Sequence, residues 1–118
     1  MNLRPFLSLA VGAASLLATS PALAHAKLVS ATPAANVAGP APRQIILRFN
    51  EKLLAKFSSF ELSHGGAAMP VKVSVGKDRL SLVGVPAKPL TAGAYEVKWH
   101  AATGDAHKMQ GAYSFTVR

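Results

Sequence analysis

Apolar and polar residues alternate one by one in several short runs of this chain, and this period of two constrains the fold more than any other feature. In the clearest run, Tyr95, Val97 and Trp99 alternate with Glu96 and Lys98. Such alternation places the apolar side chains on one face of a β-strand. About seven strand-like runs are separated by turn signals at short spacing, which predicts an all-β antiparallel sandwich or Greek-key barrel.

The expected strands lie between segments that suit loops and turns. A loop is expected at residues 33–43, which contain three prolines, and a short helical turn at residues 50–56. The run at residues 57–63 has Phe57, Phe60 and Leu62 as its apolar members. The strands are expected at residues 27–32, 44–49, 57–63, 71–75, 79–83, 95–100 and 113–117.

The length and the absence of cysteine limit both the architecture and the chemistry. A chain of 118 residues has room for one domain. Without cysteine no disulfide can form and no thiolate can act as nucleophile or metal ligand. A blue-copper electron-transfer site is excluded as well, because it needs a cysteine sulfur on the metal.

The net charge of +8 raises the question of a nucleic-acid partner. The lysines stand singly along the chain, however, and form no basic run or arginine-rich block. This spacing is typical of the solvated outer faces of strands. We therefore expect no nucleic-acid binding.

Residues 1–24 have the pattern of a secretory signal peptide that is removed on export. Arg4 precedes an apolar stretch at residues 6–17, Pro21 follows, and Ala22 to Ala24 form a small-x-small cleavage signal. The apolar stretch is shorter than the roughly 20 residues that a membrane span needs. The mature domain is therefore expected to comprise residues 25–118 and to begin at His25.

An N-terminal histidine can chelate a metal ion by itself, through its free α-amine and its ring nitrogen. Asp105 and His107 form an Asp-x-His triplet, and in an extended segment such side chains point the same way. With His25 they would supply three nitrogens and one oxygen. This set suits a tetragonal plane and favours Cu(II) or Ni(II), with Cu(II) bound most strongly, whereas zinc prefers a tetrahedral arrangement.

Several segments resemble the CopC-like periplasmic copper-binding proteins, and the resemblance covers the whole expected mature chain. The segments are His-Ala-Lys-Leu-Val-Ser-Ala-Thr-Pro at 25–33, Leu-Arg-Phe-Asn-Glu-Lys-Leu at 47–53, Pro-Leu-Thr-Ala-Gly-Ala-Tyr-Glu-Val-Lys-Trp at 89–99, and Asp-Ala-His at 105–107 before a final Tyr-x-Phe-x-Val strand.

The resemblance implies a seven-stranded Greek-key β-barrel or Ig-like β-sandwich that captures one Cu(II) ion per chain in the periplasm. It implies that His25, Asp105 and His107 are the metal ligands. Glu51 matches an acidic residue beside the site, where it would hold the amine or a ligating ring. By the same analogy the protein is a monomer with no enzymatic activity, and an inner-membrane copper transporter is its partner.

The chain departs from those relatives that carry a methionine-rich Cu(I) loop. The matching segment, residues 63–70, contains only His64 and Met69 as soft or nitrogen ligands. These are too few for a second site, so we expect a Cu(II)-only protein. We also expect His100 to be a surface residue and Met109 to fill the core.

Two other functions are compatible with the same residues. A histidine brace also occurs in copper oxygenases that act on polysaccharides, although those need an open copper face and a flat aromatic surface. The other alternative is an Ig-like interaction module that binds no metal.

Overall fold

The computed structural model describes residues 26–105 and 107–118, and they form nine β-strands and one 3₁₀ turn. The elements are β1 (Leu28–Thr32), β2 (Ala38–Gly39), β3 (Ile45–Phe49), the 3₁₀ turn η2 (Ala55–Phe57), β4 (Ser59–His64), β5 (Ala67–Met69), β6 (Val71–Val75), β7 (Ser81–Pro86), β8 (Gly93–Ala102) and β9 (Lys108–Val117).

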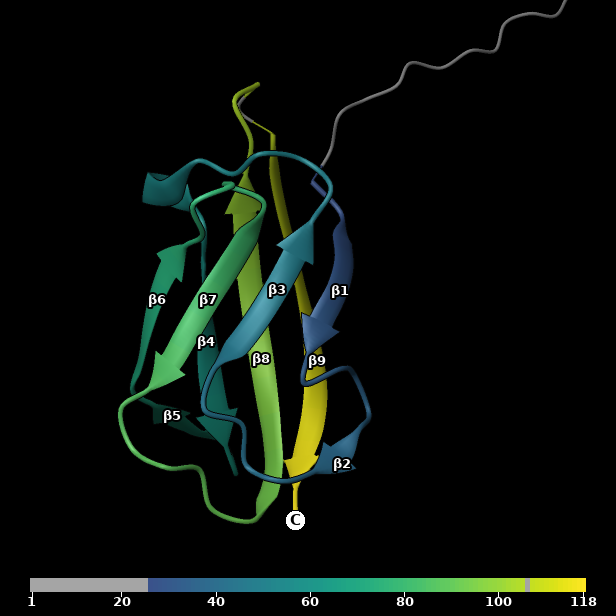
Figure 1. The fold of residues 1–118 in the computed structure, drawn as a ribbon, viewed down its shortest axis with the longest axis vertical. Coiled ribbons are helices and arrows are strands. Elements are labelled where there is room, and N and C mark those ends of the chain that lie inside the picture. Colours follow the sequence, from purple (N-terminus) through teal and green to yellow (C-terminus); the bar gives the residue numbers. More distant parts are fainter. Residues whose placement is uncertain (1–25, 106) are drawn as a thin grey trace, which may run out of the picture.

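The strands form two sheets that face one another across the core (Figure 1). One sheet has the order β1-β3-β7-β6, and the other has the order β2-β9-β8-β4-β5. All pairs are antiparallel except β2 with β9, which are parallel. The predicted all-β class is confirmed, as a two-sheet sandwich rather than a closed barrel. Within the described residues, no helix is long and apolar enough to cross a bilayer.

The core lies between the two sheets and is built from the alternating residues of the long strands. Tyr95, Val97 and Trp99 on β8 are all buried, as their period of two predicts. Tyr95 stacks on Phe115 of β9, and Trp99 meets Phe49 of β3 edge-on with ring centroids 5.1 Å apart. The Trp99–Phe49 contact therefore joins the two sheets, whereas Tyr95 and Phe115 are paired neighbours within the five-stranded sheet.

Three local expectations need correction. Phe57 is not a core residue: it closes the 3₁₀ turn with 55% of its surface exposed, and β4 begins only at Ser59. Phe60 and Leu62 are two residues apart in β4, so both side chains face the core. Phe57 lies an odd number of residues from them and before the strand, so the alternation does not place it on that face. The helical turn is confined to Ala55–Phe57, and the proline-rich loop contains the two-residue strand β2.

Gly84 on β7 provides a test of how tightly the two sheets pack. A β-carbon at this position would lie 2.2 Å from Cζ of Phe60 and 2.9 Å from Cγ1 of Val71, so the Phe60 ring occupies the space that a side chain would need. We expect Gly84→Ala to lower the free energy of unfolding by about 1–3 kcal/mol through overpacking. Gly39→Ala is the control, because a β-carbon there meets nothing within 4 Å. Equal denaturation midpoints for the two variants would contradict this packing.

Candidate metal centre

Three segments that are distant in sequence meet at one end of the sandwich: the start of β1, the segment after β3, and the loop between β8 and β9 (Figure 1). Backbone contacts join them. Leu53 forms an isolated bridge with Thr103, and the amide of Leu54 donates to the carbonyl of Ala102 at 2.9 Å. Leu53 is also fully buried in the core, which anchors its segment against the β8–β9 loop.

Asp105 and His107 are in contact in the β8–β9 loop, although Gly104 and Asp105 form a turn and not the extended segment that the prediction assumed. Asp105 Oδ2 lies 2.7 Å from His107 Nδ1, and the backbone amide of His107 donates to Asp105 Oδ1 at 3.2 Å. The loop is closed by a bond from the Thr103 amide to the His107 carbonyl at 3.1 Å. Both side chains remain a little under half exposed, so the pair is accessible from solution.

The surroundings of Asp105 keep its carboxyl group ionised. The hydroxyl of Thr103 donates to Asp105 Oδ1, and this bond is the main cause of the lowered pKa, with the His107 amide second. Together they lower the pKa of Asp105 from 3.8 to about 2. At neutral pH the carboxylate therefore needs no deprotonation before it can bind a cation.

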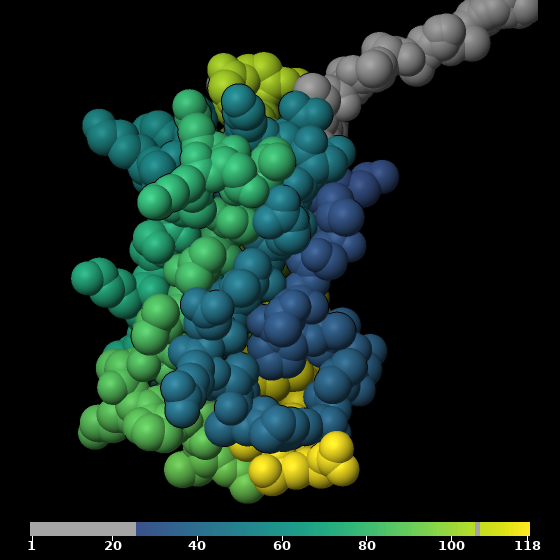
Figure 2. All heavy atoms as spheres, viewed as in Figure 1, coloured from purple at the N-terminus to yellow at the C-terminus, as the bar shows by residue number. Residues whose placement is uncertain are grey.

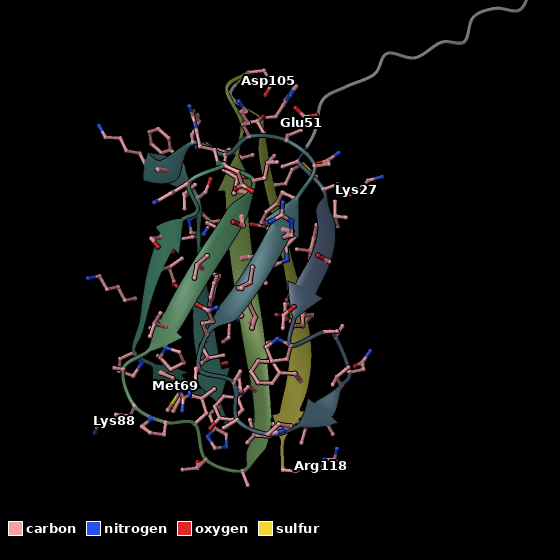
Figure 3. The ribbon with its side chains drawn as sticks, in the orientation of Figure 1. Lys27, Glu51, Met69, Lys88, Asp105 and Arg118 are labelled. Atoms are coloured by element: carbon pink, nitrogen blue, oxygen red, sulfur yellow. The ribbon has the colours of Figure 1, made fainter. Side chains whose placement is uncertain are left out.

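Glu51 lies on the same surface as Asp105. Both residues line an open hollow of about 560 Å³, together with Asn50, Lys52, Leu80, Thr103 and Gly104. Figure 3 shows Asp105, Glu51 and Lys27 at the same end of the molecule. The expectation that Glu51 holds a ligand stays a prediction, but its position beside the carboxylate agrees with that role.

The start of the described chain is held firmly at this end. Ala26 is 1% exposed and belongs to the core cluster, and the Lys27 amide donates to Asn50 Oδ1 at 2.7 Å. His25, the predicted first ligand, lies outside the described residues. Within those residues, no group of three or more histidine, aspartate or glutamate side chains could hold a metal ion.

The remaining histidines and methionines play other roles. His64 packs against Tyr95 with the ring planes tilted by 32° and the ring centroids 4.2 Å apart. Met69 packs against the core toward the opposite end of the sandwich (Figure 3). His100 is exposed, and Met109 packs against the core, as predicted. Neither Met69 nor His64 lines the hollow beside Asp105.

Two residues of this end were missed by the sequence analysis. The Thr103 hydroxyl bonds to Asp105 across a turn at Gly104 and Asp105, and a threonine two residues before an aspartate carries no distinctive signal in the sequence. Asn50 follows the last residue of β3, where an amide side chain can replace a backbone partner. That signal is weak, because asparagine is common after strands.

The fold and the site together describe one class of protein. It is a cysteine-free sandwich of two sheets, with an exposed carboxylate–imidazole pair beside the start of its first strand. The CopC domain family matches residues 28–118. The chain belongs to the CopC family. Membership of this family of non-enzymatic copper resistance proteins confirms that the chain is not an enzyme, and it removes the oxygenase alternative.

Individual relatives agree with this assignment. The chain is 41% identical over 114 residues to copper resistance protein C of Pseudomonas syringae pv. tomato, with 90% of each chain covered. Its fold is similar to the crystal structure of PcoC, a methionine-rich copper resistance protein from Escherichia coli, with a TM-score of 0.76, 40% identity, and 80% of this chain and 100% of that chain covered. CopC from Methylosinus trichosporium OB3b gives a TM-score of 0.72 at 29% identity, with 79% of this chain and 93% of that chain covered.

Proposed function

We propose that the mature chain is a periplasmic copper-binding protein that begins at His25 and holds one Cu(II) ion for copper resistance. The α-amine and ring of His25, the ring of His107 and the carboxylate of Asp105 are the proposed ligands. Residues 1–24 act as the export signal, and an inner-membrane copper transporter is the proposed recipient of the ion. Copper is the cargo of this protein and takes part in no reaction on it.

The convergence of the chain start with the β8–β9 loop is the observation that carries this proposal. Ala26, the neighbour of the proposed first ligand in the chain, is buried at this end, and successive Cα atoms are about 3.8 Å apart. Asn50 binds Lys27 and shares the hollow with Asp105, which links the two parts of the proposed site. Asp105 and His107 are already in contact.

The chemistry of this donor set favours the cupric ion. Amine and imidazole nitrogens with one carboxylate oxygen suit a tetragonal site, and Cu(II) heads the affinity order of the divalent ions. In the described part of the chain, Met69 and Met109 are the thioether side chains, and both pack against the core. This arrangement supports a Cu(II) site rather than a sulfur-rich Cu(I) site.

Electron paramagnetic resonance of the chain that begins at His25, with one equivalent of Cu(II), tests the proposal. We expect one tetragonal signal with hyperfine coupling to several nitrogens, and no further bound signal at a second equivalent. A spectrum of hydrated copper would contradict the proposal and favour a metal-free interaction module.

Copper affinity is expected to fall as the pH is lowered below about 8. A free α-amine has an ordinary pKa near 7.7–8.0, and it must lose its proton to bind, which costs about tenfold in apparent affinity per pH unit just below that value. The ligating imidazole rings must also be free of protons at the binding nitrogen, so the slope becomes steeper at lower pH. Asp105 adds no dependence in this range, because its pKa of about 2 leaves the carboxylate charged. Competition titrations between pH 5 and pH 9 measure the slope, and a flat profile would exclude the amine as a ligand.

A further inference from the structure

We infer that Asn50 is a positioning residue for the copper site, acting by holding the N-terminal segment in place. This inference rests on the proposed function, because it concerns the segment that carries His25. Asn50 itself is not proposed as a ligand. It acts through Lys27, two residues after the proposed first ligand.

The contact between Asn50 and Lys27 extends the pairing of β1 with β3 by one step. The last backbone pair of the two strands is Leu28 with Phe49. Beyond it, the Lys27 amide donates to Asn50 Oδ1 at 2.7 Å, and the Asn50 amide donates to the Lys27 carbonyl at 3.2 Å. The carboxamide oxygen thus takes the place that a backbone carbonyl would have in a continued ladder.

This added step matters because the ladder is irregular where β1 begins. The register of β1 against β3 shifts between Leu28 and Ser30. Without the Asn50 side chain, Leu28 with Phe49, next to this irregularity, would be the first complete pair of the ladder. Ala26 and Lys27 would then be held by the burial of Ala26 and by one backbone bond from Asn50.

Asn50 is also placed between the two parts of the proposed site. Its side chain binds the N-terminal segment, while the residue itself lines the hollow that Asp105 and Glu51 share. In Figure 2 the β8–β9 loop (yellow-green, at the top) and the segment that follows β3 (teal) lie at this end of the molecule. Fixing Lys27 on Asn50 therefore fixes the N-terminal segment relative to the Asp105–His107 pair, which lowers the ordering cost of bringing all ligands to one ion.

The role in positioning can be separated from a role in stability. Asn50 is exposed, so its replacement leaves no cavity in the core. Asn50→Leu keeps the approximate size and removes the acceptor, whereas Asn50→Asp keeps an oxygen that can accept the Lys27 amide. Gln44→Leu is the matched control, because Gln44 is an exposed carboxamide residue just before the other end of β3.

Three measurements on the chain that begins at His25 test the inference. Hydrogen exchange of the Lys27 amide in the copper-free protein reports the contact itself, and thermal denaturation reports stability. Competition titration with Cu(II) reports affinity. We expect Asn50→Leu to speed Lys27 exchange and to weaken copper binding by about 10-fold or more, the range found for partners that orient ligands. Asn50→Asp should restore both, and Gln44→Leu should change neither.

Some results would overturn the inference without touching the proposed function. Unchanged copper affinity in Asn50→Leu, together with fast exchange at Lys27, would show that the contact exists and does not position the site. Equal losses of affinity in Asn50→Leu and Asn50→Asp would show that the hydrogen-bond acceptor is not what matters. Failure of the proposed function appears differently, as absence of copper binding in the unsubstituted chain, whatever the exchange rate of Lys27.

Discussion

A chain with one additional residue before His25 is expected to bind Cu(II) far more weakly than the chain that begins at His25. The extension converts the α-amine of His25 into an amide, which removes one nitrogen ligand and opens the chelate ring. Removing a partner that only orients a ligand costs about 10–100-fold in metal affinity, so the loss of a ligand should exceed that range. Competition titration of both chains against a chelator of known affinity measures the difference.

An extension at the other end of the chain is the control for this comparison. One residue added after Arg118 leaves both the amine and the β8–β9 loop unchanged, and affinity should stay at its original value. Arg118 lies at the end of the sandwich opposite Asp105 (Figure 3). If the chain extended before His25 bound copper as tightly as this control, the free amine would have no part in the site.

His107→Ala is expected to have the second large effect, a loss of Cu(II) affinity of more than about 100-fold, because it removes a proposed ligand together with the ring that contacts Asp105. The thermal midpoint of the copper-free protein should change little. The side chain is 47% exposed, and exposed ion pairs contribute little to stability. The same titration, with loss of one nitrogen coupling in the resonance spectrum, measures the effect.

His100→Ala is the matched control for His107→Ala. His100 is also an exposed histidine of the β8–β9 hairpin, but it pairs with Gln110 within the sheet. Its replacement should leave copper affinity unchanged. Equal effects of the two substitutions would mean that copper binds to surface histidines in general, and the proposed site would be wrong.

The alternating pattern predicted the long strands well, because burial of one face in this sandwich follows directly from a period of two. Tyr95, Val97 and Trp99 of β8 are buried as the pattern predicts, and so are Phe115 and Val117 of β9, while Tyr113 is partly buried. The consecutive buried residues Ala101 and Ala102 at the end of β8 do not follow the alternation. The two short strands β2 and β5 could not be predicted in this way. A strand of two or three residues has too few positions for a pattern, and its pairing depends on where the chain is placed by the rest of the fold. The wrong prediction for Phe57 also arose from the pattern. A large apolar residue just before a strand looks in the sequence like one of the buried residues of that strand.

The candidate site was predictable in part. The spacing of Asp105 and His107 predicts that their side chains lie close together, and the structure shows the contact, in a turn and not in an extended segment. The proximity of Glu51 to Asp105 came from family resemblance, because it depends on the bridge between Leu53 and Thr103, which joins residues 50 apart in sequence. The roles of Asn50 and Thr103 are single hydrogen bonds, and such bonds leave no periodic pattern in a sequence.

The two parts of the proposed site belong to different layers of the sandwich. β1, which leads back to His25, is in the four-stranded sheet, and the β8–β9 loop is in the five-stranded sheet. An ion ligated from both would fasten one layer to the other in a chain that has no disulfide to do so. At a free concentration 1,000 times its dissociation constant, a bound ion adds about 4.1 kcal/mol to the free energy of unfolding. Release of copper to a recipient would then also remove the link between the two sheets at this end of the protein and lower its stability.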